Sequence, residues 1–328
     1  MIDPRWMGAA IALGERGRGR TAPNPNVGCV IVRDGRIVGA GWTQPGGRPH
    51  AEAMALAEAG AAARGAHVFV TLEPCCHESP RGPACAHLLI AAGVASVTIA
   101  VTDPDPRMDG TGIARLCEAG IAVDKGASEE EARRSMAGFL ARTLLGRPLV
   151  TLKLATSLDF RIALANGESR LITGAAARAH AHVERARSDA ILVGSGTLRA
   201  DDPRLDVRLE GLEDRSPRRL LLTRSGAGAQ GWQSLASPEA IRTIEGVNDL
   251  LVEGGADTAS AFLAADLVDR LLLYRAPILI GAGKPGIGDI GLTALPDAHG
   301  RWRLADSRTL GRDRLEVYER VRTASTGA

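Results

Sequence analysis

The chain has 328 residues, enough for two domains that each bury a core, and its 45% hydrophobic and 24% charged residues are typical of a globular protein. The formal net charge of +2 and the lack of a dense basic cluster argue against nucleic acid or a membrane surface as the partner, so we expect a small-molecule ligand. No apolar run approaches the ~18 residues that span a bilayer, and the N-terminal segment lacks a signal-type cleavage site, so we expect a cytoplasmic protein.

Strand and helix patterns alternate in the first part of the chain, which predicts a three-layer α/β domain. Two apolar runs joined by Arg-Asp-Gly-Arg predict a hairpin over residues 27–43, because Asp-Gly is a strong turn signal. An alanine-rich segment predicts a helix over residues 51–63. We expect the following strands and helices further on: strands at 67–73, 94–101 and 121–126, and helices at 85–93 and 112–119.

A connecting helix is predicted over residues 128–148. Ser128 and Glu131 have capping-box spacing at its start, and Gly146 and Pro148 supply a stop. A second α/β pattern begins at Leu149, so the expected domains are 1–146 and 147–323. In the second domain we expect strands at 149–157, 189–197, 218–223, 249–255 and 268–281, and helices at 173–188 and 258–267; most of 209–246 is poorly patterned.

His50 and Glu52 stand two residues apart at the entrance of the 51–63 helix. Helix propensity does not explain the pair, because the segment is already rich in Ala, Leu and Met. One interpretation is that His50 caps the helix loosely and Glu52 complements the helix dipole. Residues two apart lie about 200° around a helix axis, so the two side chains can converge only on something beyond the helix end. Their position at the N-terminus permits this.

The five cysteines are an odd number, which argues against a disulfide framework. Cys75 follows a predicted strand, and Cys85 opens a predicted helix, where a thiol ionises more easily. With His50 they would give zinc three protein ligands and leave the fourth tetrahedral position for water, as in catalytic sites. Glu52 would then carry protons between that water and the substrate. We interpret Cys29 and His87 as packing residues. We interpret His67 and His182 as surface or structural residues.

Two rival ligands keep this interpretation open. Zinc nucleobase deaminases combine His-x-Glu with Pro-Cys-x-x-Cys, but here the second cysteine lies ten residues after the first. Cys76 or His77 could be a fourth ligand, which would make the site structural and leave Glu52 idle. A nucleic-acid deaminase with an accessory α/β domain is another alternative. The near-neutral charge and the few aromatic residues, four Trp, two Tyr and four Phe, argue against it.

Motifs from both halves of the chain resemble one family, the bifunctional deaminase-reductases of riboflavin biosynthesis. The deaminase half is matched by TAPNPNVGCVIV, PHAE, VTLEPCCHESPRGPAC and LIAAGV, and the reductase half by LKLATSLDFRIA, GESRLIT, GTLRADDPRLDVR and LLVEGGADT. The resemblance implies a cytidine-deaminase-like domain followed by a dihydrofolate-reductase-like domain. It also implies that zinc-dependent hydrolysis removes an amine from a phosphoribosylated diaminopyrimidinone, after which NADPH reduces the ribose to ribityl.

For the deaminase half, the resemblance implies residue roles. Alignment on LIAAG indicates Cys85 as the third zinc ligand beside His50 and Cys75, with Glu52 as the catalytic residue. Asn24 would contact the substrate, although it could instead form an Asx turn between two prolines. The DPDP segment would line the same site with two carboxylates, Asp103 and Asp105.

For the reductase half, the resemblance implies two sets of contacts and a catalytic role for Asp201 in proton transfer. Two arginines in separate elements could clamp a phosphate, and glycines after a strand let backbone N–H groups approach a pyrophosphate. The expected substrate contacts are Ser169, Arg185, Leu205, Arg208 and Glu253. The expected NADPH contacts are Ala155, Leu171, Thr197, Asp201, Gly255, Ala256, Asp257 and Thr258. We also expect a homo-oligomer, a dimer.

Overall fold

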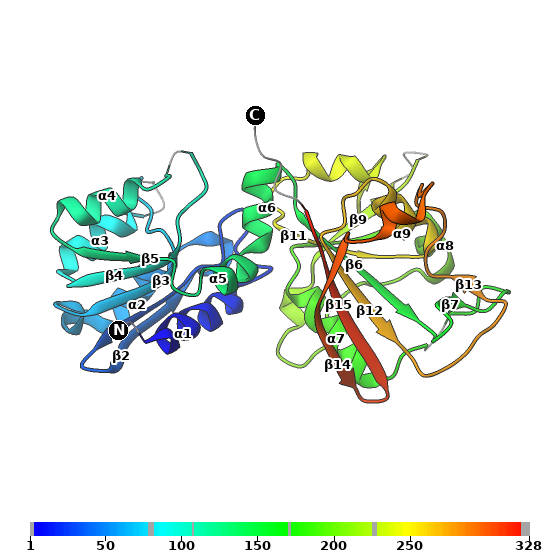
Figure 1. Ribbon diagram of the computed structural model, residues 1–328, viewed down its shortest axis with the longest axis horizontal. Coiled ribbons are helices and arrows are strands. Elements are labelled where there is room, and N and C mark those ends of the chain that lie inside the picture. Colours follow the sequence, from blue (N-terminus) through cyan, green and yellow to red (C-terminus); the bar gives the residue numbers. More distant parts are fainter. Residues whose placement is uncertain (1–2, 78–81, 107, 170–171, 225–227, 323–328) are drawn as a thin grey trace. The chain divides into compact units, whose positions relative to one another are not determined.

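The computed structural model describes residues 3–77, 82–106, 108–169, 172–224 and 228–322, and the chain divides into two compact units, Met1–Gly146 and Arg147–Ala328 (Figure 1). Each unit has its own sheet and its own hydrophobic core. Both units are mixed α/β structures, which confirms the predicted fold class. Within the described ranges, every helix is too short or too polar to cross a membrane.

The first unit is built on a five-stranded sheet in the order β2-β1-β3-β4-β5. Its strands are β1 (Gly28–Arg33), β2 (Arg36–Trp42), β3 (His67–Leu72), β4 (Ser96–Val101) and β5 (Ala122–Lys125). Strand β1 runs antiparallel to β2 and β3, whereas β3, β4 and β5 run parallel. The predicted hairpin is confirmed: Asp34 and Gly35 have φ of 51° and 70°, as a two-residue type I′ turn requires.

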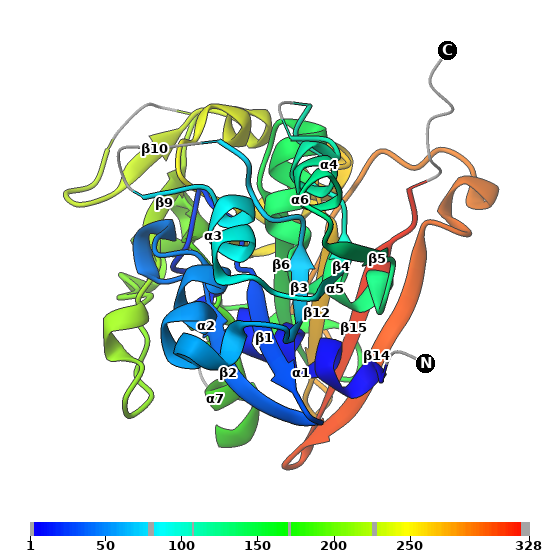
Figure 2. The ribbon, with the colours of Figure 1, turned by 90° about the vertical axis from the view of Figure 1, so that its left-hand side faces the viewer.

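Helices cover both faces of this sheet, and Figure 2 shows α1 (Pro4–Gly14) and α2 (Ala51–Ala59) on opposite sides of β1. A Cβ on Gly28 would lie 1.8 Å from the carbonyl oxygen of Ala10 in α1, and a Cβ on Gly41 would lie 2.3 Å from that of Ala51 in α2. Gly28 pairs with Trp42, so Gly41 faces the opposite side of the sheet. The unit therefore has three layers. Its other helices are α3 (Cys85–Ala92), α4 (Thr111–Glu118), α5 (Glu129–Ser135) and α6 (Ala137–Leu145).

Two predicted helices differ from the observed ones. The helix that starts at Ala51 ends at Ala59 and continues as a 3-10 turn, because Gly60 has a positive φ of 52°. The single helix expected over 128–148 is two helices, α5 and α6, separated by Met136, whose buried side chain anchors the break to the core. The predicted capping box is absent: Ser128 has φ of 53° and makes no side-chain cap bond.

The second unit contains an eight-stranded sheet in the order β10-β9-β8-β11-β6-β12-β15-β14. The strands are parallel except for β15, which is antiparallel to both β12 and β14. The bounds are β6 (Leu149–Thr156), β8 (Ala190–Gly194), β9 (Arg218–Leu222), β10 (Gln233–Leu235), β11 (Asp249–Glu253), β12 (Arg270–Arg275), β14 (Trp302–Leu310) and β15 (Asp313–Arg320). A small separate sheet pairs β7 (Arg161–Ala163) with β13 (Lys284–Pro285).

Helices α7 (Ala175–Ala186) and α9 (Ala256–Ala264) cover opposite faces of this sheet. In β12, Leu273 belongs to the core that includes Phe262 of α9, whereas its neighbours Leu272 and Tyr274 belong to the core that includes Ala177 of α7. A third helix, α8 (Ser195–Asp201), follows β8 directly. Because β6, β8 and β11 are adjacent and parallel, their carboxyl ends meet at one edge, where open α/β sheets bind ligands.

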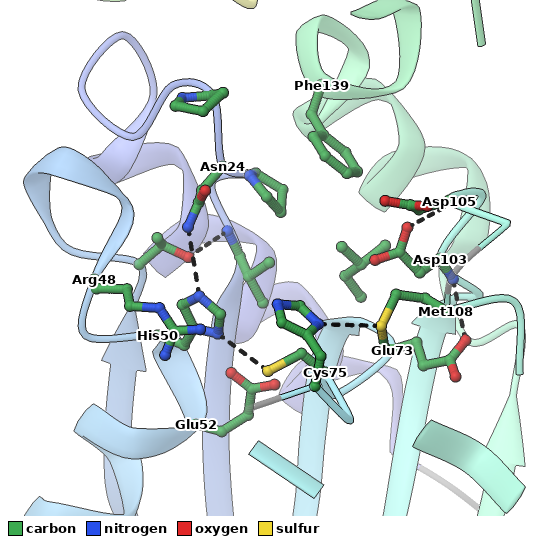
Figure 3. Close-up of a pocket in the computed structure, with 16 residues that line it drawn as sticks. Asn24, Arg48, His50, Glu52, Glu73, Cys75, Asp103, Asp105, Met108 and Phe139 are labelled. Atoms are coloured by element: carbon green, nitrogen blue, oxygen red, sulfur yellow. Dashed lines mark hydrogen bonds between the residues drawn. The ribbon is translucent and has the colours of Figure 1, made fainter. Parts of the chain in front are cut away.

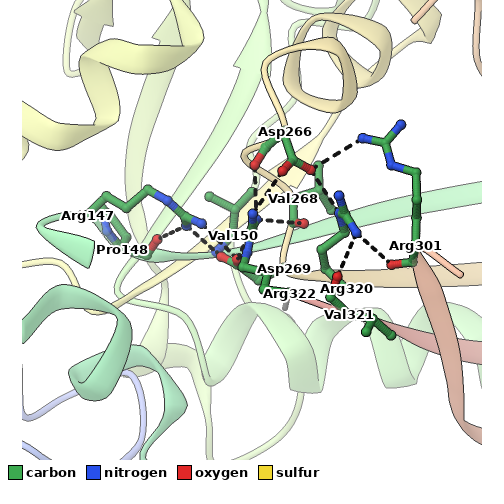
Figure 4. A network of polar contacts seen from close by, with 10 residues as sticks. All are labelled: Arg147, Pro148, Val150, Asp266, Val268, Asp269, Arg301, Arg320, Val321 and Arg322. Carbon is green, nitrogen blue, oxygen red and sulfur yellow. Dashed lines mark hydrogen bonds and ion pairs between the residues drawn. The ribbon is translucent and has the colours of Figure 1, made fainter. Parts of the chain in front are cut away.

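A network of polar contacts fixes the chain at the start of the second unit (Figure 4). The Arg147 guanidinium donates two hydrogen bonds to the Asp269 carboxylate, at 2.6 and 2.8 Å, and the Val150 N–H donates a third at 2.9 Å. Arg322 contacts the same carboxylate at 3.0 Å. Arg147 is 3% exposed, so this pairing is needed to compensate its buried charge. The network therefore holds the beginning of β6 against the end of the chain.

We expect Gly28→Ala to destabilise the protein by roughly 1–3 kcal/mol or more, as overpacking does, because the added methyl group would overlap the Ala10 carbonyl oxygen. Gly8→Ala is the matched control: it lies inside α1 with open space around it, so it should stabilise by up to about 1 kcal/mol. Urea unfolding followed by circular dichroism measures both changes. Unchanged stability of Gly28→Ala would contradict this packing argument.

Candidate active sites

The first site is formed where the carboxyl end of β3 meets the N-termini of α2 and α3 (Figure 3). His50 is the N-cap residue of α2, with extended backbone angles. Cys75 lies beyond the end of β3, and Cys85 is the first residue of α3. Three chain segments thus bring one imidazole and two thiols together.

The ligand atoms of His50, Cys75 and Cys85 lie within 4.8 Å of one another. His50 Nδ1 is 3.5 Å from Cys75 Sγ and 3.4 Å from Cys85 Sγ. Tetrahedral zinc with bonds of 2.0 to 2.3 Å separates its ligand atoms by about 3.3 to 3.8 Å, so these side chains fit the metal as they stand. The structure therefore brings together the three residues that the sequence predicts as ligands.

The N-terminus of α3 acts on both thiols. Besides carrying Cys85, it directs the Cys85 N–H to the Sγ of Cys75 at 3.4 Å. Hydrogen bonds from the Cys85 side chain, from His50 and from this N–H lower the pKa of Cys75 to about 4. The expectation that Cys85 ionises more easily at the helix start is wrong for the pair as it stands: the hydrogen bond with Cys75 and burial raise the pKa of Cys85, and the amide that begins α3 stabilises the Cys75 thiolate instead.

The two rival ligands are not members of this ligand cluster. Cys76 Sγ contacts the sulfur of Met108 at 3.7 Å, and His77 Nδ1 contacts the same sulfur at 3.4 Å. Among the described residues, the cluster therefore offers a metal three protein ligands and no fourth. This is the ligand count of a catalytic zinc site rather than of a structural one.

Glu52 lies in the first turn of α2 beside this cluster and is 3% exposed. Burial raises the pKa of its carboxyl group to about 7, although the neighbouring His50 opposes the shift. Cys29, which we interpret as a packing residue, is fully buried in the core near Glu52, and burial raises the pKa of its thiol. A buried carboxyl group beside a metal position is suited to proton transfer.

A cavity of about 330 Å³ opens onto the cluster. Its lining includes Asn24, Asp103 and Asp105, as the resemblance implies. The Asn24 side-chain amide donates to the Gly47 carbonyl at 2.7 Å, which fixes its orientation at the cavity wall. The sequence-based interpretation missed Arg48, Met108 and Phe139, which also line the cavity.

Glu73 is a further residue that the sequence-based interpretation missed. Its buried carboxylate accepts N–H groups from the segment that carries Asp103 and from the start of α4. The donors are Asp103 at 3.2 Å, Gly110 at 3.1 Å, Gly112 at 2.8 Å and Ile113 at 3.3 Å. Glu73 therefore fixes the wall of the cavity opposite α2. The sequence signal that could have identified Glu73 is its position directly before Pro74 and Cys75.

The second site is a cavity of about 380 Å³ at the carboxyl ends of β6, β8 and β11. It gathers most of the residues that the resemblance assigns to the reductase half: Ala155, Ser169, Arg185, Thr197, Asp201, Leu205, Arg208, Glu253 and Gly255. Ala256, Asp257 and Thr258 form the adjoining first turn of α9. Leu171 lies outside the described residues. The cavity also contains Lys153 and His182, neither of which was predicted to belong to it.

An ion-paired cluster forms the floor of this cavity. Arg185 donates to both Glu253 oxygens, at 2.8 and 2.9 Å, and Lys153 Nζ lies 3.7 Å from one of them. Burial disfavours the charged form of Glu253, but Lys153 and Arg185 outweigh it and hold the pKa of this carboxyl group at about 2. The Arg185 fork is thus occupied by Glu253, so the expected clamp of two arginines on one phosphate is not what the structure shows.

Arg208 and His182 lie at the rim of the same cavity. The Arg208 N–H donates to His182 Nδ1 at 3.3 Å, and the Arg208 guanidinium donates to Asp206 at 2.8 Å. Burial, Arg185 and Arg208 lower the pKa of His182, which favours the neutral ring. His182 therefore lines the cavity, and its hydrogen bond with the Arg208 N–H is consistent with the interpretation of His182 as a surface or structural histidine.

The start of α9 is shaped to approach a ligand closely. Gly255 is its N-cap, and no side chain caps the first N–H groups of the helix. A Cβ on Gly194 would lie 2.3 Å from Thr258 Oγ1, and a Cβ on Gly254 would lie 3.0 Å from Thr258 Cβ. Glycines at the ends of β8 and β11 therefore let the first turn of α9 reach the sheet edge. Uncapped N–H groups at such a position suit a dinucleotide pyrophosphate.

Comparison with known proteins matches both halves of the chain. The family described as cytidine and deoxycytidylate deaminase zinc-binding region matches residues 2–101, and the RibD C-terminal domain matches residues 148–315. The riboflavin biosynthesis protein RibD of Escherichia coli (strain K12) is 40% identical over 95% of this chain and 98% of its own length.

Solved structures are similar over nearly the whole chain. Acinetobacter baumannii RibD, form 1, has a TM-score of 0.88 at 36% identity and covers 97% of this chain and 99% of its own. A Thermotoga maritima protein described as a diaminohydroxyphosphoribosylaminopyrimidine deaminase/5-amino-6-(5-phosphoribosylamino)uracil reductase has a TM-score of 0.86 at 30% identity, covering 97% and 98%.

We expect Cys75→Ser and Cys85→Ser each to lose bound zinc, because each removes one of three thiolate or imidazole ligands. Cys76→Ser should keep zinc, since its sulfur faces Met108. Metal analysis of the purified variants measures the zinc content per chain. Equal zinc loss from Cys76→Ser and Cys85→Ser would show that the ligand set is different.

Proposed function

The chain belongs to the RibD family of bifunctional riboflavin-biosynthesis enzymes, and from this membership we propose which of its residues perform the two reactions. The protein is a zinc-dependent deaminase and an NADPH-dependent reductase of riboflavin biosynthesis. We assign deamination to residues 1–146 and reduction to residues 147–323. The observation that carries the assignment is the convergence of His50, Cys75 and Cys85 beside a buried glutamate in one unit, with a separate ligand-shaped cavity in the other.

The proposed deaminase substrate is 2,5-diamino-6-(5-phosphoribosylamino)pyrimidin-4(3H)-one. Zinc held by His50 Nδ1 and the two thiolates would supply an activated water as the nucleophile. Glu52 would take a proton from that water at its carboxylate and deliver it to the leaving amine, which departs as ammonia. Asn24, whose side-chain nitrogen lies 3.5 Å from His50 Nε2, would orient the pyrimidine from the wall that carries His50.

The proposed reductase substrate is the deaminated product, whose ribosyl group becomes ribityl. NADPH would supply the hydride, and its contacts would come from Ala155, Thr197, Asp201, Gly255 and the first turn of α9 with Ala256, Asp257 and Thr258. Asp201, an exposed carboxyl group in the cavity wall, would exchange the proton that the reduced ribose requires.

The proposed substrate contacts in the reductase cavity place a cation at the phosphate and a carboxylate at the sugar. Arg208, whose side chain is 56% exposed at the rim, would contact the phosphate, with Ser169 and Leu205 along the same wall. Arg185 would act by holding Glu253 in an ionised and fixed position towards the sugar.

We also propose that the protein is a cytoplasmic homo-dimer. The exposed side chains of Leu158 and Leu279 support self-association, because they lie on adjacent segments joined by the hydrogen bond from the Leu158 N–H to the Ile278 carbonyl. Light scattering coupled to size-exclusion chromatography measures the mass in solution. A single species with the 34.3 kDa mass of one chain would contradict the dimer.

We expect Glu52→Ala to keep zinc and fold but to slow ammonia release by roughly 10²- to 10⁴-fold, the usual loss when a general acid-base group is removed. Glu52→Gln keeps the shape of the side chain and should be equally slow. Ammonia release from the phosphoribosyl diaminopyrimidinone is the assay, with zinc content as the control. Near-normal release by either variant would remove Glu52 from the mechanism.

Asp201→Asn should slow NADPH oxidation on the deaminated intermediate, because a neutral amide cannot exchange the required proton. Zinc content and ammonia release should stay normal, so deaminated but unreduced intermediate should accumulate. Asp202→Asn is the matched control, since this neighbouring carboxylate is exposed and does not line the cavity. Loss of ammonia release with normal NADPH oxidation in Asp201→Asn would contradict two independent sites.

A further inference from the structure

One guanidinium in the deaminase cavity has no hydrogen-bond or ion-pair partner among the described residues. Arg48 lies at the edge of the cavity, two residues before His50, and is half-buried. No hydrogen bond or ion pair joins its side chain to another residue within the described ranges. Its Nη1 atom lies against Gly82, 3.1 Å from where a Cβ of that residue would be, just before the segment that leads to Cys85. Its donor nitrogens are not among the buried unsatisfied atoms of the described residues, so they are open to the cavity and available to an anion that enters it.

The other charged groups that line the cavity are already engaged. Glu73 is held by four backbone N–H groups, and His77 contacts Met108. Among the described lining residues, Arg48 is therefore the one cation with a permanent charge. Figure 3 shows Arg48 beside His50, while Asp103 and Asp105 lie on the opposite wall. The cavity thus has the Arg48 guanidinium at one edge and the carboxyl groups of Asp103 and Asp105, which have contacts of their own, across from it.

This arrangement matches a substrate with an anionic end. The carboxylates of Asp103 and Asp105 would repel a phosphate, whereas amino groups of a pyrimidine could donate to them. Residues 48 and 50 are at most about 7 Å apart along the chain, so a substrate whose reacting carbon lies at the His50 cluster, and whose phosphate is separated from that carbon by the pyrimidine ring and one sugar unit, can place the phosphate near Arg48. The guanidinium fork suits two phosphate oxygens.

From these contacts we infer that Arg48 binds the 5′-phosphate of the deaminase substrate and makes the site selective for phosphoribosylated over ribosylated pyrimidines. The inference rests on the proposed deaminase function and adds to it a residue that discriminates between the two substrates. Because the phosphate is remote from the bond that breaks, Arg48 acts on substrate binding and orientation rather than on the chemical step.

The test is a cycle of two enzymes and two substrates. Ammonia release is measured without NADPH for wild type and Arg48→Ala, on the phosphoribosyl diaminopyrimidinone and on its ribosyl counterpart made with a phosphatase. Arg48→Ala should lower kcat/KM roughly 10- to 100-fold on the phosphorylated substrate, as expected for lost charge-assisted hydrogen bonds. It should leave kcat/KM on the ribosyl substrate unchanged. Arg48→Lys should restore part of the preference, because it keeps the charge without the fork.

Controls separate this role from a structural one. Arg36→Ala removes an exposed, unpartnered arginine at the far end of the β1–β2 hairpin and should change neither substrate. Zinc content, and NADPH oxidation on the deaminated intermediate, should be normal in Arg48→Ala. In calorimetry, ribose 5-phosphate should bind Arg208→Ala, which lacks the proposed phosphate contact of the second unit, and should bind the double variant Arg48→Ala/Arg208→Ala more weakly.

The possible failures are distinguishable. Equal loss of kcat/KM on both substrates, or equal loss in Arg36→Ala, would overturn the assignment of the phosphate to Arg48 while leaving the deaminase function in place. Ribose 5-phosphate binding that is equally strong in Arg208→Ala and in the double variant would also overturn it. Zinc-loaded wild type that releases no ammonia from either substrate would overturn the deaminase function itself, and the role of Arg48 with it.

Discussion

Close packing of α2 on the β1–β2 hairpin is the constraint on which the deaminase site depends. Ala51, Ala55 and Ala59 form a buried stripe at helical spacing, and glycines at 39 and 41 accept that stripe. A Cβ on Gly39 would lie 2.1 Å from the Ala55 carbonyl oxygen, so no larger residue fits there. The close approach of α2 to the hairpin therefore requires small residues on this face of the helix, in addition to the high helix propensity of alanine. It fixes the start of α2, and with it His50 and Glu52, against the end of β3.

The two sites stabilise buried charge in different ways. In the deaminase site, Glu52 is buried without a cation bonded to it, and burial raises its pKa to about 7. In the reductase site, Glu253 is equally enclosed, but Arg185 and Lys153 keep its pKa at about 2. The first environment suits a group that exchanges protons, and the second suits a group that stays ionised and oriented. Neighbouring cations, rather than burial, therefore decide the difference.

The sequence predicted those parts of the structure that local patterns determine. The Asp34–Gly35 turn and the sequence of most helices and strands along the chain followed from short segments. Local chemistry also indicated a metal site with His50 and two cysteines, but the choice of Cys85 over the rivals Cys76 and His77 came from the family resemblance. The family resemblance was needed for the reductase cavity, because its lining comes from many separate elements with no shared spacing.

Other features depended on tertiary contacts that a linear pattern does not contain. Met136 breaks the expected helix because its side chain is buried in the core. Helix α1 was missed although Asp3 and Pro4 provide an N-cap and a helix start, and its N-cap bond to the Arg5 N–H is present at 3.0 Å. The hairpin of β14 and β15 was missed because its edge strand is largely exposed and carries no apolar alternation.

The proposals for the two units share one feature: each assigns the substrate phosphate to an arginine at a cavity edge. Arg48 lies beside the metal cluster, and Arg208 lies at the rim of the reductase cavity, each outside the groups assigned to the chemical steps. The product of the first reaction keeps the phosphate of its substrate, so both sites must bind the same anionic end while acting on different atoms. A phosphate contact set apart from the reacting atoms meets that requirement, because it contributes binding in both steps without constraining either chemistry. Arg208 is already bonded to Asp206 whereas Arg48 has no partner among the described residues, so phosphate binding must displace or share an ion pair in the second site but not in the first.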